Sequence, residues 1–225
     1  LCCRANFATI DKGGVITDRR AKNSGQRMSD AEGAELCALL QDAISKIDDV
    51  QVSIRAGKGH RFVVIFSGPG LHDALSDSDP GKEDKPPLSV KPLMPEAEKA
   101  ALVANRFIEM SGAVLKSRDR ANWVLLRGFS LPPNLPPFPE KYKLRAAAVA
   151  AYPMYKGLAR LLGMEVLNCG ETWDDEVATV AKHRDEFDFF YLHFKEFDQA
   201  GEDGDFEKKV ELLERFDEQI VPRIV

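Results

Sequence analysis

The chain has 225 residues, of which 44% are hydrophobic and 30% are charged, enough for a buried core in one or two domains and too apolar for an intrinsically disordered chain. The formal net charge of −5 argues against a nucleic-acid-binding surface. Every apolar run is shorter than the roughly 18 residues of a transmembrane helix, so no membrane span is expected.

The first elements expected from the sequence are a hairpin and a helix. Two short alternating runs, 6–11 and 14–18, predict a pair of antiparallel strands. Ser29 and Glu32 have the spacing of a capping box, which predicts that a helix begins here. The apolar residues that follow have helical periodicity and are expected to form its buried face: Ala34, Leu36, Leu39, Leu40, Ile44 and Ile47.

Further along, the pattern changes between strands, a loop and a helix. Strands are expected at 50–55 and 61–67. The segment 68–95 is rich in Pro, Gly, Asp and Lys, which predicts a long loop over a surface. A helix is expected from Pro95 onward, and 122–127 has the pattern of a buried strand ending in a cation. Together these elements predict an α+β module with a helix packed on one face of a sheet.

Several arginines lie at or beside the ends of the expected strands. The planar guanidinium group suits bidentate recognition of phosphate and carboxylate groups. These residues are therefore candidate anion ligands, although arginine is also common on ordinary protein surfaces. The candidates are Arg4, Arg19, Arg20, Arg61 and Arg127, and Asp18-Arg19-Arg20 is the strongest group.

A proline-rich segment divides the chain. Residues 131–139 contain five prolines in nine positions and predict a semi-rigid linker that is neither a helix nor a central strand. Beyond the linker, strand and helix patterns alternate, which predicts a parallel sheet with helical crossovers. The expected strands are 145–151, 165–168 and 187–192, the last buried on both faces, and the expected helices are 153–162 and 173–184.

An acidic, Gly-punctuated loop is expected after the last strand. It contains His193, Lys195, Asp198, Glu202, Asp203 and Asp205. Carboxylates and imidazole beyond the carboxyl end of a strand suit a Mn, Zn or Mg site. Alternatively, Asp203 and Asp205 cap the following helix and the other charges form a solvated face. That helix is expected to bury Phe206, Val210, Leu213, Phe216 and Ile220.

The motif in this loop resembles that of a known family. His193-x-Lys195-x-x-Asp198-x-Ala-Gly-Glu-Asp-Gly is similar to His-x-Lys-x-x-Asp-x-Ala-Gly-His-Asp-Gly of the archaeal-type cofactor-independent phosphoglycerate mutases, metalloenzymes of the alkaline phosphatase superfamily. Other segments resemble family segments in the same order: 4–11, 18–21, 75–80, 122–128, 140–142 and 156–164. The resemblance extends over nearly the whole chain.

The resemblance implies an α/β protein with two domains. Residues 1–130 would form an inserted α+β substrate-binding domain, 131–139 the linker, and 140–225 part of a parallel-sheet, phosphatase-like domain. In the family, the motif's Asp and the His four residues later bind one of two metal ions, and here these positions are Asp198 and Glu202. The family's Ser nucleophile, amino-terminal Asp ligand and Gly-Asp-His motif are not found here, so a central fragment that is inactive alone is expected.

The resemblance also implies a function for the full-length protein. It would interconvert 3-phosphoglycerate and 2-phosphoglycerate, a glycolytic step, through a phosphoserine intermediate and with Mn²⁺, or Zn²⁺, Mg²⁺ or Co²⁺. Lys195 and Lys156 would assist the transfer, and Lys141 would bind substrate together with Asp18 and the arginines. Two alternatives stay open. One is a related phosphoester or phosphonate enzyme of the kind labelled phosphonopyruvate decarboxylase, and the other is an inactive anion-binding relative, which Glu202 in place of His favours.

The cysteines indicate the compartment. Cys2, Cys3, Cys37 and Cys169 form no CxxC pair, and their scatter is typical of a reducing cytoplasm. The expected partner is a small phosphorylated acid, with neither nucleic acid nor membrane, and the oligomeric state is left open.

Overall fold

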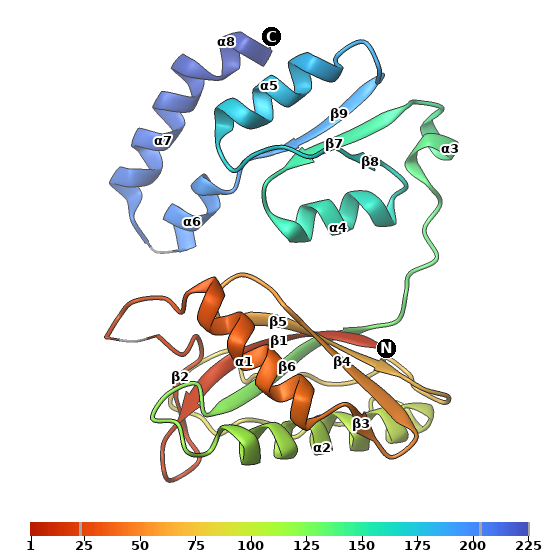
Figure 1. Cartoon of the computed structure of the whole chain (residues 1–225), viewed down its shortest axis with the longest axis vertical. Coiled ribbons are helices and arrows are strands. Elements are labelled where there is room, and N and C mark those ends of the chain that lie inside the picture. The colour runs from red at the N-terminus through yellow and green to blue at the C-terminus, as the bar shows by residue number, and fades with distance from the viewer. Residues whose placement is uncertain (23, 203, 225) are drawn as a thin grey trace. The chain divides into compact units, whose positions relative to one another are not determined.

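The chain forms two compact units, Leu1–Pro132 and Pro133–Val225, in a computed structural model that describes residues 1–22, 24–202 and 204–224. The boundary between them falls within the proline-rich segment 131–139. Each unit has its own sheet, antiparallel in the first and parallel in the second (Figure 1). The mixed α/β architecture expected from the sequence is therefore confirmed.

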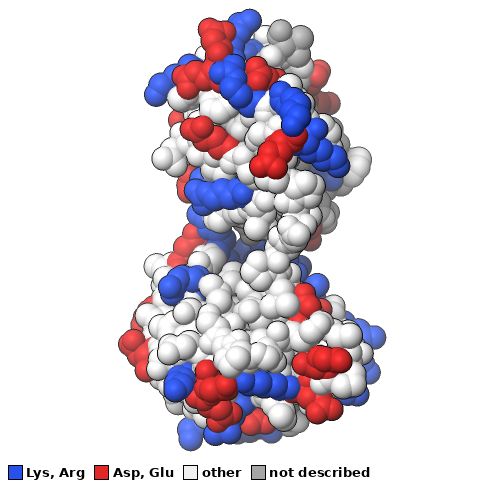
Figure 2. All heavy atoms as spheres, turned by 90° about the vertical axis from the view of Figure 1, so that its right-hand side faces the viewer, with Lys and Arg blue, Asp and Glu red and all other residues white. Residues whose placement is uncertain are grey.

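Charged side chains of both signs are mixed on the surface. On the face drawn in Figure 2, Lys and Arg are interspersed with Asp and Glu over each unit, and neither sign forms a large continuous patch. This mixture agrees with the small formal net charge of −5. On that face there is no extended field of one sign to attract a polyanion.

In the described parts of the chain, no helix is both long enough and apolar enough to cross a bilayer.

The first unit is a six-stranded antiparallel sheet with helices. Its elements are β1 (Cys2–Ile10), β2 (Ile16–Asp18), α1 (Asp30–Ala43), β3 (Lys46–Ile47), β4 (Val50–Ala56), β5 (Arg61–Ser67), α2 (Glu98–Leu115) after a 3₁₀ turn at Pro95–Ala97, and β6 (Trp123–Ser130). The order is β3-β4-β5-β1-β6, and β2 pairs with the end of β1. The predicted hairpin, the strands at 50–55, 61–67 and 122–127 and the helix from Pro95 are confirmed.

Helix α1 begins as predicted and ends earlier. The Ser29 Oγ accepts the N–H of Glu32 at 3.2 Å, which confirms the N-cap. The Glu32 carboxylate pairs with Arg120 at 2.6 Å and does not close a capping box. Ile44 is already the C-cap, and Ile47 lies in the unpredicted strand β3, so the expected continuation of the helical face was wrong. Pairing with β4 holds this β-branched residue in a strand instead.

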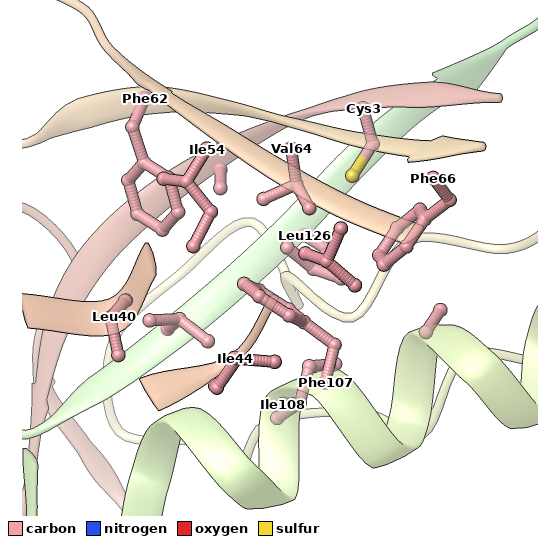
Figure 3. Close-up of a cluster of buried hydrophobic side chains, with 14 of the residues drawn as sticks. Cys3, Leu40, Ile44, Ile54, Phe62, Val64, Phe66, Phe107, Ile108 and Leu126 are labelled. Atoms are coloured by element: carbon pink, nitrogen blue, oxygen red, sulfur yellow. The ribbon is translucent and has the colours of Figure 1, made fainter. Parts of the chain in front are cut away.

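The core of the first unit lies between the sheet and its two helices (Figure 3). The ring of Phe7 stacks on that of Phe62 with centroids 4.5 Å apart, and Phe66 meets Phe107 of α2 edge to face at 5.7 Å. Both helices contribute side chains to this one core, including Leu40 of α1. The helices therefore cover the same face of the sheet, and the opposite face is left for other contacts.

The long segment before α2 is a loop that is partly buried. Residues 68–94 contain no helix or strand, apart from an isolated bridge between Leu75 and Pro92, as the loop prediction required. However, Ser78 is fully buried. Its N–H donates to the Leu126 carbonyl at 2.8 Å and its Oγ accepts the Leu126 N–H at 2.7 Å, so it lies directly against β6. Asp79 beside it is also buried. The loop thus covers the free edge of β6 and does not run only over a surface.

The second unit contains a parallel sheet with the order β8-β7-β9. Its elements are α3 (Phe138–Tyr142), β7 (Ala146–Ala150), α4 (Pro153–Leu161), β8 (Glu165–Val166), α5 (Trp173–His183), β9 (Phe189–His193), α6 (Glu196–Glu202), α7 (Phe206–Gln219) and α8 (Val221–Ile224). The predicted alternation of strands and helices and the parallel pairing are confirmed. The linker prediction was wrong for Phe138 and Pro139, which begin α3, because proline is tolerated in the first turn of a helix.

Three details of the second unit differ from the sequence prediction. Strand β9 is half-exposed because within the described residues it pairs only with β7, at the edge of the sheet. The expected acidic loop contains the short helix α6. In α7 the buried side chain is Leu212, whereas Leu213 and Phe206 are exposed. Phe216 and Ile220 pack in the cluster around Trp173, so the predicted buried face is confirmed at these two residues and wrong at Phe206 and Leu213.

Candidate functional site

Three arginines lie on the face of the first sheet opposite the helices. Side chains alternate along a strand, so Arg4 faces away from the core that contains Ala5. In the sheet register Arg4 is opposite Arg127 of β6, and Asn6 is opposite Arg61 of β5. Residues paired in this way have Cβ atoms about 5 Å apart. Arg4, Arg61 and Arg127 are called the arginine group below.

A buried carboxylate joins a fourth arginine to this group. Arg19 donates from Nε and Nη2 to the two carboxylate oxygens of Asp79, at 2.9 and 2.7 Å. The Arg127 Nη1 atom lies 3.5 Å from Asp79 Oδ2, and the Asp79 side chain is only 1% exposed. Burial alone would raise the pKa of Asp79, but the hydrogen bonds from Arg19 and Gly81 and the charge of Arg127 lower it below its usual value. Arg19 therefore has a clear structural partner.

Asn6 adds an unsatisfied polar atom on the same face. Its side chain is almost completely buried, and its Oδ1 has no hydrogen-bond partner among the described residues. Buried acceptors without a partner are rare in folded proteins. A donor on a bound molecule or water would satisfy this oxygen. The arginine group thus has a neutral acceptor beside its positive charges.

Asp18 shapes the loop that carries Arg19 and Arg20. Its Oδ1 accepts the backbone N–H of Arg20 at 2.7 Å, and its Oδ2 accepts that of Lys22 at 2.9 Å. Such bonds from an aspartate to the following backbone stabilise a turn. The structure therefore assigns Asp18 a local backbone role, and its contribution to ligand binding stays a prediction.

A second positive cluster surrounds His60. The side chain of His60 is buried, and its pKa is lowered to about 4 by burial first and then by the charges of Arg61, Arg20 and Arg27. Arg20 and Arg61 were predicted as candidates, whereas Arg27 was not. The structure thus brings Arg20 close to the arginine group through Arg61, and it adds Arg27 to the same region.

The depressed pKa of His60 predicts a pH-dependent stability. Between about pH 6.5 and pH 4 the unfolded chain binds a proton at this histidine that the folded chain does not, so stability is lost as the pH falls through this range. The expected loss is at most about 3 kcal/mol. It can be measured by urea unfolding at pH 7, 5.5 and 4.5, followed through NMR signals of β5. His60→Gln is expected to reduce the loss and the control His183→Gln to preserve it; an unchanged slope in His60→Gln would contradict the assignment.

In the second unit, polar residues gather at the carboxyl edge of the parallel sheet. The Lys195 ammonium, just beyond β9, pairs with Asp198 and lies 5.5 Å from the centroid of the Tyr152 ring. The Tyr155 ring stacks on the His193 ring with centroids 3.3 Å apart. Burial lowers the pKa of His193 and favours its neutral form. The end of β9 is thus held by aromatic contacts from the beginning of α4.

A buried glutamate lies at the same edge. Glu176 of α5 is 2% exposed and accepts the backbone N–H of Ala151 at 2.8 Å. Burial, offset in part by this bond, raises the pKa of Glu176 to about 7. Burial and the Glu176 charge raise the pKa of Cys169. Because the charge of Lys156 acts on both groups, Lys156 lies at this edge, as Lys195 does.

The predicted metal ligands lie one turn apart on α6. Asp198 and Glu202 are exposed and four residues apart, a spacing that places both carboxylates on one helix face. No group of three His, Cys, Asp or Glu side chains that could hold a metal ion is found in residues 1–22, 24–202 and 204–224. Among these described residues Asp198 and Glu202 do not form a complete metal site, and their role as metal ligands stays a prediction. Asp205 caps α7 by accepting the Lys208 N–H at 2.9 Å, as the capping interpretation required, and Asp203 lies outside the described residues.

Lys141 is the predicted site residue that the structure does not bring to this edge. It lies on α3, 5.4 Å from the centroid of the Tyr142 ring. Helix α3 packs through Phe138 on Phe189, which is the amino end of β9. Lys156 and Lys195 lie at the opposite, carboxyl ends of the strands.

Three residues of these sites were not predicted from the sequence. Arg27 lies in a segment without a strand or helix pattern, and Asn6 was counted only as part of a strand. Glu176 reads as one more charged residue of an amphipathic helix. Helical periodicity carries the only available signal for Glu176, since it shares a face with the buried residues Trp173 and Val177.

Comparison with protein families gives two overlapping matches. Residues 1–120 match the family model described as 2,3-bisphosphoglycerate-independent phosphoglycerate mutase. Residues 66–225 match the model described as Metalloenzyme superfamily. Each covers more than half of the chain, and together they include both units.

Curated relatives have the same description. A probable 2,3-bisphosphoglycerate-independent phosphoglycerate mutase of Thermotoga neapolitana is 47% identical over 222 residues, which is 99% of this chain and 54% of the relative. Proteins of the same name from Thermosipho melanesiensis and Thermus thermophilus are 48% and 43% identical, over 98% and 99% of this chain and 54% of each relative. The chain thus spans about half the length of the curated relatives it matches.

Solved structures agree with these matches. The cofactor-independent phosphoglycerate mutase from Thermoplasma acidophilum is 31% identical, with a TM-score of 0.59 over 86% of this chain and 54% of that one. The PH0037 protein from Pyrococcus horikoshii is 23% identical and shows the same fold, with a TM-score of 0.72 over 99% of this chain and 54% of that one. The chain belongs to the 2,3-bisphosphoglycerate-independent phosphoglycerate mutase family, within the metalloenzyme superfamily.

Proposed function

We propose that this chain supplies the substrate-binding module and part of the phosphoryl-transfer site of a cofactor-independent phosphoglycerate mutase. The whole protein would interconvert 3-phosphoglycerate and 2-phosphoglycerate through a phosphorylated serine outside this chain. The observation that carries the proposal is the arginine group on a sheet face of a chain that belongs to this family. Residues 1–130 would be the substrate-binding domain, and 140–225 would be part of the metalloenzyme domain.

The arginine group suits a small acid with two anionic groups. Phosphoglycerate carries a phosphate and a carboxylate, and arginine binds either one in a bidentate manner. Arg4 and Arg127 lie on adjacent strands in register, so two guanidinium groups can reach one small molecule. The unpartnered Oδ1 of Asn6 could accept a hydrogen bond from a hydroxyl group of the acid. Arg19 would act indirectly, by holding Asp79 against Arg127.

The carboxyl edge of the second unit suits the transfer step. The ammonium groups of Lys195 and Lys156 would stabilise negative charge on the transferred phosphoryl group. Asp198 and Glu202 would contribute to one of two metal sites, with Mn²⁺ as the first candidate. A bound divalent ion would supply charge neutralisation at the reacting oxygens. The ion pair between Lys195 and Asp198 would open when the carboxylate binds the metal.

A binding experiment on this chain tests the substrate-binding part of the proposal. We expect 3-phosphoglycerate to shift the ¹H–¹⁵N NMR signals of Arg4, Asn6, Arg61 and Arg127. A charge-assisted hydrogen bond contributes about 1.5–3 kcal/mol, so Arg127→Ala is expected to weaken binding about 10- to 100-fold. Arg127 is preferred to Arg19 for this test because its contact with Asp79 is longer.

The control is an exposed arginine elsewhere in the same unit. Arg106 of α2 pairs loosely with Asp48 at 3.9 Å and has an exposed side chain. Arg106→Ala should leave the affinity for 3-phosphoglycerate unchanged. Equal losses in both variants would indicate a general effect of charge, and the assignment of the arginine group as the substrate site would then be wrong.

A further inference from the structure

A buried carboxylate connects three elements at the carboxyl edge of the second sheet. Glu176 projects from α5, is 2% exposed, and accepts the Ala151 N–H at 2.8 Å. Ala151 follows the last residue of β7 and precedes α4. Burying a carboxylate without hydrogen bonds is costly. The bond from Ala151 is therefore expected to be kept in the folded protein, and it ties the turn after β7 to α5.

The turn held by Glu176 carries two aromatic rings that contact the end of β9. Tyr152, the N-cap residue of α4, has its ring 5.5 Å from the Lys195 ammonium. Tyr155, in the first turn of α4, stacks on His193. A cation over an aromatic face and a stacked ring pair each favour one geometry. A shift of the turn at Ala151 would therefore be transmitted to His193 and Lys195.

Four charged or titratable groups face Glu176. Asp175 is its neighbour on α5, Lys156 comes from α4, Glu196 from the start of α6, and Cys169 from the segment after β8. The carboxylates of Glu196 and Asp175 disfavour the charged form of Glu176, while Lys156 and the Ala151 N–H favour it. Glu176 is therefore close enough to α4, α6 and the segment after β8 for charges to act between them, and its one hydrogen bond, to Ala151, connects it to β9 through the turn.

We propose that Glu176 is a positioning residue, which holds the Ala151–Tyr155 turn by its hydrogen bond and thereby fixes the places of Lys156, His193 and Lys195. Its consequence for phosphoryl transfer rests on the proposed function, whereas its consequence for the turn does not. This role requires that the side chain of residue 176 is long enough for its acceptor oxygen to contact the Ala151 N–H. It does not require the negative charge of the carboxylate. The experiment therefore varies side-chain length and charge separately.

Two conservative variants of this chain make that separation. Glu176→Gln keeps an acceptor at the same distance and removes the charge, whereas Glu176→Asp keeps the charge and shortens the side chain by one methylene. In Glu176→Asp, we expect amide exchange at Ala151 to be about 10-fold faster, because its hydrogen bond is weakened. The Tyr155–His193 ring contacts should disappear from NOE spectra. Glu176→Gln should keep the exchange rate and the contacts.

Two references show whether the effect is local. The Leu167 amide donates to Ala148 at 3.0 Å in the same sheet, and its exchange should not change in either variant. Glu186, whose side chain is 61% exposed, offers the matched substitution Glu186→Asp, which should leave Ala151 and His193 as they are. Wild-type behaviour of Glu176→Asp, or a loss in Glu176→Gln equal to that in Glu176→Asp, would overturn the proposal.

Kinetics in the whole protein test the catalytic consequence. Displacement of a catalytic group costs about 10- to 100-fold in rate, so Glu176→Asp should lower kcat by that factor and change KM less than about 3-fold. Glu176→Gln should restore kcat to near the wild-type value. An unchanged kcat in Glu176→Asp would overturn the role in catalysis. If the wild-type whole protein lacks mutase activity, only the proposed function is contradicted. The amide-exchange and NOE measurements on this chain still decide whether Glu176 positions the turn.

Discussion

Replacement of Arg19 by alanine is expected to lower the free energy of unfolding of the first unit by about 3 kcal/mol, because it leaves a buried carboxylate without its main partner. The Asp79 side chain is 1% exposed, and both of its carboxylate oxygens accept from Arg19, at 2.9 and 2.7 Å. The Arg127 guanidinium, at 3.5 Å, and the Gly81 N–H offset only part of the loss. Urea unfolding followed through NMR signals of β1 and β6 measures the change.

A double variant shows whether the loss of stability comes from the unpaired charge of Asp79 or from the packing contacts of Arg19. If the penalty comes from the uncompensated charge of Asp79, Arg19→Leu with Asp79→Leu should recover most of the stability, since apolar residues can replace a buried pair at little cost. Arg106→Ala, which removes an exposed arginine, should change the stability by less than about 0.5 kcal/mol. If Arg19→Ala were as mild as Arg106→Ala, the interpretation of Arg19 as a structural partner of Asp79 would be wrong.

The elements with strong local signals were predictable from the sequence. Alternating strands such as β4 and β5, the proline-rich segment before α3 and the alternation of strands and helices in the second unit each follow from short-range patterns. The N-cap at Ser29 is another example, because its Oγ bonds to a backbone N–H only three residues away. In these cases the interaction that forms the element lies within the segment itself.

Predictions failed where distant contacts decide the structure. Ile47 continues a helical pattern, but pairing with β4 draws it into a strand. Leu213 and Leu212 fit α7 almost equally well, and the aromatic cluster around Trp173 selects Leu212. Helix α6 forms in a segment whose glycine and acidic residues are typical of a loop. Propensity is a weak guide when tertiary packing favours another choice.

The sequence indicated which types of residue would form the candidate sites, but it did not indicate which residues they would contact. Arginines at strand ends indicated an anion site, yet the bidentate pair of Arg19 with Asp79 joins residues 60 positions apart. Glu176 could not be identified because its burial depends on α5 packing beside β7. Asn6 became a candidate only when the register placed it opposite Arg61. Contacts between residues far apart in the sequence therefore decide which arginines have a structural partner and which are candidate ligands.

The largest effect on activity is expected from Asp198. It lies in the first turn of α6, has an exposed side chain, and pairs with Lys195. As a metal ligand it would support stabilisation worth several kcal/mol, so Asp198→Ala should lower mutase turnover at least about 1000-fold. Glu196, two residues earlier on the same helix, offers the control Glu196→Ala, which should retain turnover within about 10-fold.

The decisive measurement is the conversion of 3-phosphoglycerate to 2-phosphoglycerate by the whole protein that contains this chain, without added bisphosphoglycerate. It is made with and without Mn²⁺, beside Asp198→Ala and Glu196→Ala. Turnover that depends on the metal and disappears in Asp198→Ala alone is the predicted result. Absence of conversion by the wild-type protein with any divalent metal, or conversion that Asp198→Ala leaves intact, would contradict the proposed function of this edge.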